Sequence, residues 1–220
     1  MIDIKNVSFS YDNTRSILHD VSVCFSQGKT YSVFGPSGSG KSTLLALLGG
    51  VATPTSGEIW INGQNIATLE STLIRRTLVS YIFQAYLLFP FLTAQENVEI
   101  AYGICKPKEK KAAEKATLLL SELGIDGTLL RKQVRYLSGG EQQRVGIARA
   151  LVTGNPILLA DEPTGNLDKS TANDVMQLLI KLTKEYNKTC IIVTHSEMIR
   201  SQTDCSFLLD DGCITQVDSK

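Results

Sequence analysis

The chain has 220 residues and a formal net charge of zero, with 43% hydrophobic and 20% charged residues. This composition fits one globular domain, and the balanced charge argues against a global attraction to nucleic acid. No apolar run is as long as a membrane span, so a role at a membrane requires a partner protein. Five scattered cysteines form no CxxC pair. This argues against zinc and disulfides, and we expect the cysteines to be small buried hydrophobic residues.

The first third of the chain is rich in strand patterns. Apolar and polar residues alternate at 1–11, and a second strand pattern spans 17–25 after a turn at 12–13. The apolar run at 30–34 predicts a buried strand, and 58–63 predicts a short strand that ends in an Asn-Gly turn. We therefore expect a β-rich subdomain at the N-terminus.

A glycine-rich stretch follows the strand predicted at 30–34 and precedes an apolar helix pattern. Its residues are Gly35, Pro36, Ser37, Gly38, Ser39, Gly40, Lys41, Ser42 and Thr43. A phosphate-binding P-loop requires this order of strand, loop and helix. In such a loop, backbone N–H groups and the positive end of the helix dipole face the phosphates. We expect Lys41 to reach the β- and γ-phosphates of a nucleotide, and Ser42 to ligate Mg²⁺.

The stretch from 85 to 152 has a mostly helical character. Apolar residues recur at helical spacing at 93–102 and 108–123, and again after the run Leu137-Ser138-Gly139-Gly140-Glu141. We expect a single domain in which this helical insertion separates two parts of an α/β core, at about 1–84 and 153–220.

Two buried strand patterns in the last third end in residues suited to catalysis. The run at 156–160 leads into Asp161 and Glu162, and the run at 189–194 leads into His195. Parallel strands bring their carboxyl ends to one edge of a sheet, where ligands bind. Side chains alternate along a strand, so the two carboxylates can differ in role. We expect Asp161 to hold Mg²⁺ and Glu162 to accept a proton from an attacking water.

An amphipathic helix pattern at 171–186 and a hairpin around Asp-Gly at 207–215 complete the chain. Together these elements predict an α/β fold. Its parts are a P-loop NTPase core with a mainly parallel sheet, an N-terminal antiparallel β-subdomain and a helical insertion subdomain.

The chain resembles the ATP-binding subunit of ATP-binding-cassette (ABC) transporters over essentially its whole length. The resemblance rests on the P-loop, Gln84, the Leu137–Glu141 run, 157–162, Asn166-Leu167-Asp168 and His195. The segment between Lys41 and Ser138 is too short for the coiled-coil insertion of chromosome-maintenance or double-strand-break-repair ATPases.

The resemblance implies roles for residues around the P-loop. Tyr11 would stack on adenine, although a residue at this position also suits packing in a hairpin. Gln84 would touch Mg²⁺ or the attacking water and would sense the transporter core. His195 would contact the γ-phosphate and hold the attacking water in line.

The resemblance also implies a dimer. Ser138, Gly139 and Gly140 precede a helix whose N-terminus favours an anion. In the family this anion is the γ-phosphate of ATP bound to the other subunit, and Asp168 would touch that subunit's P-loop. We therefore expect a head-to-tail dimer that depends on ATP.

Residues 92–98 and 163–168 resemble the macrolide-efflux, lipoprotein-release and antimicrobial-peptide-export branch. This implies an ATPase that powers a separate membrane permease from the cytoplasmic face, for export or extraction of a peptide, lipid-linked or drug-like substrate. The alternatives are a soluble ABC ATPase acting on nucleic acid or ribosomes, and a mechanical signalling ATPase of the cell-division type. We expect no nucleic-acid partner. The apolar stretch at 87–91 is either the groove that receives the permease or part of the core.

Overall fold

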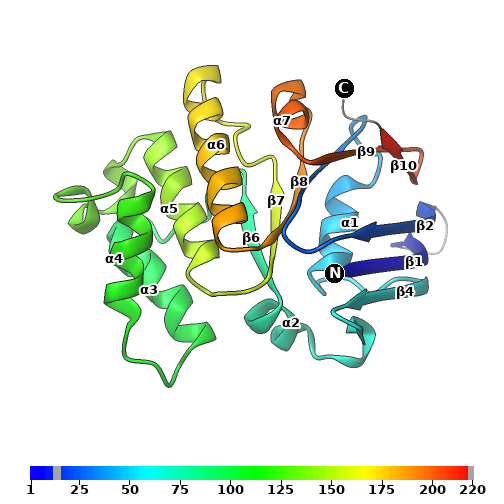
Figure 1. Ribbon diagram of the computed structural model, residues 1–220, viewed down its shortest axis with the longest axis horizontal. Helices are drawn as coiled ribbons and strands as arrows, with labels where there is room; N and C mark the ends of the chain where they lie inside the picture. The colour runs from blue at the N-terminus through cyan, green and yellow to red at the C-terminus, as the bar shows by residue number, and fades with distance from the viewer. Residues whose placement is uncertain (12–15, 218–220) are drawn as a thin grey trace.

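The computed structural model describes residues 1–11 and 16–217, so the turn expected at 12–13 lies outside the described residues. Two sheets form its framework (Figure 1). One has four strands in the order β2-β1-β4-β5 and the other has six in the order β10-β9-β3-β8-β7-β6. The strands are β1 (Ile2–Ser10), β2 (Ser16–Phe25), β3 (Thr30–Phe34), β4 (Ser56–Ile61), β5 (Gln64–Asn65), β6 (Val79–Phe83), β7 (Ile157–Asp161), β8 (Thr189–Val193), β9 (Cys205–Asp210) and β10 (Cys213–Val217).

The α-helices are α1 (Lys41–Leu48), α2 (Ser71–Thr77), α3 (Ala94–Cys105), α4 (Ala112–Glu122), α5 (Gly139–Leu151), α6 (Lys169–Glu185) and α7 (Glu197–Gln202). Three of them, α3, α4 and α5, lie between β6 and β7 in the sequence, as expected for the helical stretch.

The six-stranded sheet is mainly parallel. Strand β3 pairs in parallel with β8 and β9, and β7 pairs in parallel with β6 and β8. Only β10 runs antiparallel, where it forms the predicted hairpin with β9. Strands β1, β2, β4 and β5 pair antiparallel throughout. This arrangement confirms the predicted fold class.

The six-stranded sheet separates two hydrophobic clusters. Along β7, Leu158 and Ala160 belong to one cluster, and Ile157 and Leu159 belong to the other. The first cluster contains residues of α3, α4, α5 and α6, and the second contains residues of α1 and the antiparallel sheet. Figure 1 shows these two groups on opposite sides of the strands. The parallel strands are therefore buried on both faces, which explains their nearly continuous apolar runs.

Helices α3 and α5 each begin with a capping box. Thr93 and Glu96 form the box of α3, and Ser138 and Glu141 form the box of α5. An isolated bridge pairs Thr93 with Gln133. Backbone hydrogen bonds on either side of the bridge run from Ala94 N–H to the Lys132 carbonyl (3.1 Å) and from Val134 N–H to the Leu92 carbonyl (3.0 Å). The start of α3 is thus tied to residues 132–134, in the segment that leads to α5.

Two sequence predictions need correction. Helix α4 begins at Ala112 rather than near 108. The residues before it form a turn, in which the Glu109 N–H donates to the Lys106 carbonyl (3.0 Å) and the Glu109 carboxylate accepts a hydrogen bond from Tyr102 Oη. Of the five free cysteines only Cys190 is buried, whereas Cys24 and Cys213 are exposed. Within the described residues we find no helix with both the length and the apolar character needed to cross a membrane.

Candidate functional site

The glycine-rich loop joins β3 to α1. Gly40, the N-cap of α1, has a φ of 103°, a left-handed conformation that favours glycine. Gly35 lies so close to Leu209 that an added Cβ would be 1.9 Å from its carbonyl oxygen. Lys41 is 7% exposed, and its Nζ donates to the carbonyls of Gly35 (3.0 Å) and Pro36 (2.7 Å). Burial lowers the pKa of Lys41, while Glu162 and Asp161 oppose this shift.

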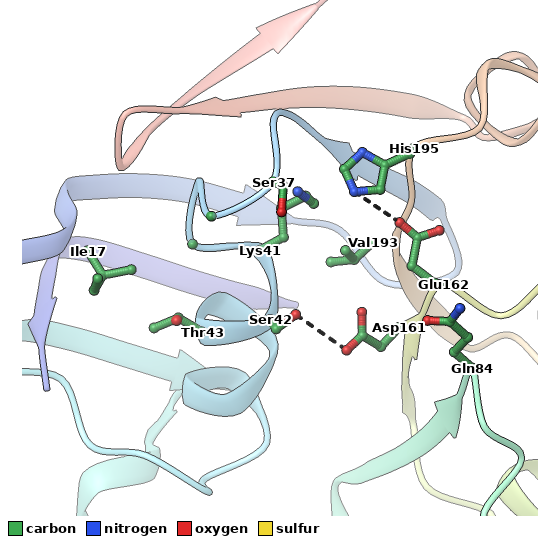
Figure 2. Close-up of a pocket in the computed structure, with 12 residues that line it drawn as sticks. Ile17, Ser37, Lys41, Ser42, Thr43, Gln84, Asp161, Glu162, Val193 and His195 are labelled. Atoms are coloured by element: carbon green, nitrogen blue, oxygen red, sulfur yellow. Dashed lines mark hydrogen bonds and ion pairs between the residues drawn. The ribbon is translucent and has the colours of Figure 1, made fainter. Parts of the chain in front are cut away.

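A cavity of about 420 Å³ opens beside this loop, at the carboxyl ends of the parallel strands. Figure 2 shows side chains from the P-loop, from the end of β7 and from the segments that follow β6, β7 and β8 around one space. The lining residues are Ile17, Ser37, Gly38, Gly40, Lys41, Ser42, Thr43, Gln84, Asp161, Glu162, Val193 and His195. The structure therefore brings together ten of the residues predicted for nucleotide, metal and catalysis, drawn from distant parts of the chain.

Asp161 and Glu162 point to different partners, as Figure 2 shows. Ser42 Oγ donates to Asp161 Oδ2 at 3.4 Å. Glu162 has a φ of 45°, just after the end of β7, and its Oε1 lies 3.5 Å from His195 Nε2. Thr194 Oγ1 donates to the other Glu162 oxygen at 3.4 Å.

Burial raises the pKa of both carboxyl groups. For Glu162, the nearby His195 opposes this shift. A higher pKa makes Glu162 a stronger base than an exposed carboxylate, which suits it to accept a proton near neutral pH.

Three oxygen donors suit a magnesium ion. They are the Ser42 hydroxyl, the Asp161 carboxylate and the Gln84 side-chain amide, and all line the same cavity. Among the described residues, no group of three or more His, Cys, Asp or Glu is placed to hold a metal. The oxygen set fits Mg²⁺, because this ion binds few protein carboxylates and completes its shell with water and substrate phosphates.

Tyr11 and Ile17 lie on the side of the cavity formed by the antiparallel sheet. Tyr11 is 70% exposed and does not line the cavity, but its Oη lies 3.4 Å from Thr43 Oγ1. Its ring also packs edge-on against Phe9, so the structure permits both expected roles. Ile17 does line the cavity. Its sequence context does not mark it as a site residue, because an apolar residue at the start of a strand is ordinarily a core residue.

Several predicted residues do not line the cavity. Gly35 and Ser39 belong to the P-loop backbone behind it, and Ser138, Gly139, Gly140 and Asp168 lie where α5 and α6 begin. Ser138 Oγ accepts from the Glu141 N–H at 3.3 Å. Asp168 Oδ1 accepts hydrogen bonds from the Ser170 hydroxyl and from the backbone N–H groups of Ser170 and Thr171. These hydrogen bonds hold the pKa of Asp168 well below its usual range. An added Cβ on Gly140 would lie 2.5 Å from Thr171 Cγ2, so the two helix starts are in close contact.

The apolar stretch at 87–91 is largely exposed, so as a whole it is not core, although Leu88 is half-buried and packs against the first hydrophobic cluster. Leu87, Phe89 and Phe91 are 58%, 52% and 68% exposed. The fully buried amide of Asn97 fixes this loop: it accepts from Phe89 N–H (2.8 Å) and donates to the carbonyls of Phe89 (3.2 Å) and Thr93 (2.9 Å). The backbone is thus satisfied inside while the large side chains face outward.

The chain is similar to known ATP-binding proteins. The family model described as ABC transporter matches residues 18–165. YclH of Bacillus subtilis (strain 168), an ABC transporter ATP-binding protein, is 38% identical over 98% of this chain and 96% of its own length. The lipoprotein-releasing system ATP-binding protein LolD of Legionella pneumophila (strain Lens) is 40% identical over 92% of this chain and 90% of its own.

A solved structure agrees with these relatives. It is the dimer of the ATP-binding cassette MJ0796 in a post-hydrolysis state with ADP and Pi, which superimposes with a TM-score of 0.89 and 35% identity over 100% of this chain and 99% of that one. The relatives, the fold and the gathered residues lead to one conclusion. The chain belongs to the ABC transporter family and is an ATP-binding ATPase of a membrane transporter.

Proposed function

We propose that this ATPase powers a separate membrane permease, from the inner face of the membrane, and drives export or extraction of a peptide, lipid-linked or drug-like substrate. One observation carries the proposal: a single cavity gathers a P-loop lysine, a metal-binding oxygen set, a carboxylate and a histidine. The name of the relative LolD, a lipoprotein-releasing system protein, supports extraction among the possible tasks. The residues at 92–98 and 163–168 support the same branch.

The cavity residues divide the hydrolysis of ATP among them. Glu162 accepts a proton from the attacking water, and His195, 3.5 Å from Glu162, holds that water toward the γ-phosphate. Lys41 neutralises charge on the β- and γ-phosphates. Ser42, Asp161 and Gln84 would hold Mg²⁺, which supplies further neutralisation of the phosphate charge when bound.

A second copy of the chain would complete the site. Ser138, Gly139 and Gly140 form the N-terminus of α5, and the positive end of the helix dipole favours an anion there, yet these residues do not line the chain's own cavity. We assign them to the γ-phosphate bound by the partner, with Asp168 facing the partner's P-loop. The dimeric state of the solved relative supports this assembly.

The permease would dock in a groove beside the exposed 87–91 loop. Two cavities of about 330 and 260 Å³ share Arg75, Tyr81 and Phe83, and the larger also reaches Leu87 and Arg149. Contiguous exposed apolar surface of this kind marks interaction sites. In this scheme 85–152 acts as a helical subdomain between the core segments 1–84 and 153–220, and it transmits movement from the groove to Ser138.

The test uses the purified chain and the Glu162→Gln variant. The wild type should hydrolyse ATP in the presence of Mg²⁺, whereas the variant should bind ATP, lose turnover by about a thousandfold and accumulate as a dimer in light scattering. Ser138→Arg in the same background should keep ATP binding by the monomer but lose the dimer. Wild-type turnover in the Glu162→Gln variant would refute the assigned role. A dimer that survives Ser138→Arg would refute the composite site.

A further inference from the structure

Gln84 is hydrogen-bonded to Asn166, in the loop after the catalytic carboxylates. Gln84 Nε2 donates to Asn166 Oδ1 at 3.3 Å, and Asn166 Nδ2 donates back to the Gln84 carbonyl at 3.0 Å. The two residues are 82 positions apart in the sequence. The contact is therefore a tertiary link between the end of β6 and the start of α6.

The surrounding backbone is built to allow this link. The Gly165 N–H donates to the Glu162 carbonyl (3.0 Å) and the Leu167 N–H to the Thr164 carbonyl (3.1 Å), so two overlapping turns place Asn166 opposite Gln84. An added Cβ on Gly165 would lie 2.7 Å from Gln84 Nε2. A side chain at position 165 would thus displace the Gln84 amide.

The link decides which end of the Gln84 amide faces the cavity. The nitrogen is held by Asn166, so the amide oxygen lies on the side of Asp161, as Figure 2 shows. Mg²⁺ accepts oxygen ligands, and an amide turned the other way would present N–H groups to the ion. Groups that orient a metal ligand through a hydrogen bond contribute to affinity without touching the metal.

We infer that Asn166 is a positioning residue that holds the Gln84 amide with its oxygen toward the metal site. This inference rests on the proposed role of Gln84 toward Mg²⁺. Both residues are exposed, so their hydrogen bonds contribute little to the stability of the fold. Their effect is on the orientation of one amide. Asp168 is two positions after Asn166. The same link therefore joins the chain's own metal site to the segment of this chain that is proposed to face the partner's P-loop.

The test measures Mn²⁺ affinity by electron paramagnetic resonance in the Glu162→Gln background with saturating ATP. Asn166→Ala should weaken Mn²⁺ binding by about tenfold and leave ATP affinity without metal unchanged. Asn166→Asp keeps an acceptor for Nε2 and should recover most of the affinity. In the Gln84→Ala background, Asn166→Ala should have no further effect. Asn173→Ala is the matched control. Asn173 lies on α6 and accepts a side-chain hydrogen bond from Gln202 of α7, and neither residue lines the cavity.

A second readout needs no metal. The side-chain amide resonance of Gln84 in nuclear magnetic resonance spectra should shift in Asn166→Ala and stay in place in Asn173→Ala. The inference is overturned if Asn166→Ala leaves Mn²⁺ affinity unchanged, or weakens it equally with and without Gln84. If Gln84→Ala itself does not weaken Mn²⁺ binding, the metal role of Gln84 fails as well. The proposed function would still stand in those cases if the same substitutions, made with Glu162 intact, leave ATP hydrolysis active and dependent on Mg²⁺.

Discussion

Lys188 carries a buried charge that the site does not use, and replacing it should stabilise the protein. Lys188 is 4% exposed and lies between α6 and β8. Its Nζ donates to the Asn155 carbonyl at 2.5 Å. Burial lowers the pKa of Lys188 from 10.5 to about 8. We expect Lys188→Met, which keeps the straight chain and removes the charge, to raise the free energy of unfolding.

The magnitude follows from proton linkage. A shift from 10.5 to about 8 corresponds to about 3 kcal/mol of destabilisation when the lysine is charged. The folded state has the lower pKa, so this cost is fully present below about pH 8 and fades as the pH rises toward the unfolded value. Methionine gives up the hydrogen bond to Asn155, which costs about 1 kcal/mol. The net gain at neutral pH should be about 2 kcal/mol.

The assay is urea unfolding of both proteins at about pH 7 and about pH 9.5, where the variant's advantage should shrink by about 2 kcal/mol. Lys181→Met is a suitable control, because Lys181 is exposed and pairs with the exposed Glu185 across one helical turn. Its effect should stay near zero at both pH values. A Lys188→Met variant that is less stable than the wild type at neutral pH, or whose advantage does not change with pH, would refute the reasoning.

Two further predictions concern packing and nucleotide binding. An alanine Cβ at Gly49 would lie 1.6 Å from Tyr81 Oη, which donates to the Leu45 carbonyl, so Gly49→Ala should lower the free energy of unfolding by about 2 kcal/mol. Gly103 on α3 has nothing within 4 Å of its added Cβ, so Gly103→Ala should instead raise the free energy of unfolding by about 1 kcal/mol. Urea unfolding measures both variants, and equal changes in the free energy of unfolding would contradict both predictions. Tyr11→Ala should weaken ATP binding by about tenfold in calorimetry while Tyr11→Phe does not, since stacking needs the ring and not the hydroxyl. Unchanged affinity in Tyr11→Ala would leave Tyr11 as a packing residue.

The fold and the cavity were predictable where one local pattern determines them. The P-loop and the apolar runs before Asp161 and His195 each require a strand that ends at the same sheet edge, and parallel pairing then brings them together. The start of α4 was not predictable, because helical spacing does not reveal the turn before it, where Glu109 accepts a hydrogen bond from Tyr102 of α3.

The remaining features depend on tertiary contacts that leave little trace in the sequence. Exposure of Phe89 and Phe91 follows from the buried amide of Asn97, and a hydrophobic pattern does not distinguish an exposed loop from a buried one. The partnership of Gln84 with Asn166 likewise joins segments that only the folded sheet brings together.

The pairing between the start of α3 and residues 132–134 has a consequence for local stability. Because the Thr93–Gln133 bridge lies between two backbone hydrogen bonds, opening the start of α3 also releases residues 132–134. We therefore expect these two segments to open as one cooperative unit. The backbone amides of Ala94 and Val134 would then exchange with solvent in the same event, although they lie 40 positions apart in the sequence.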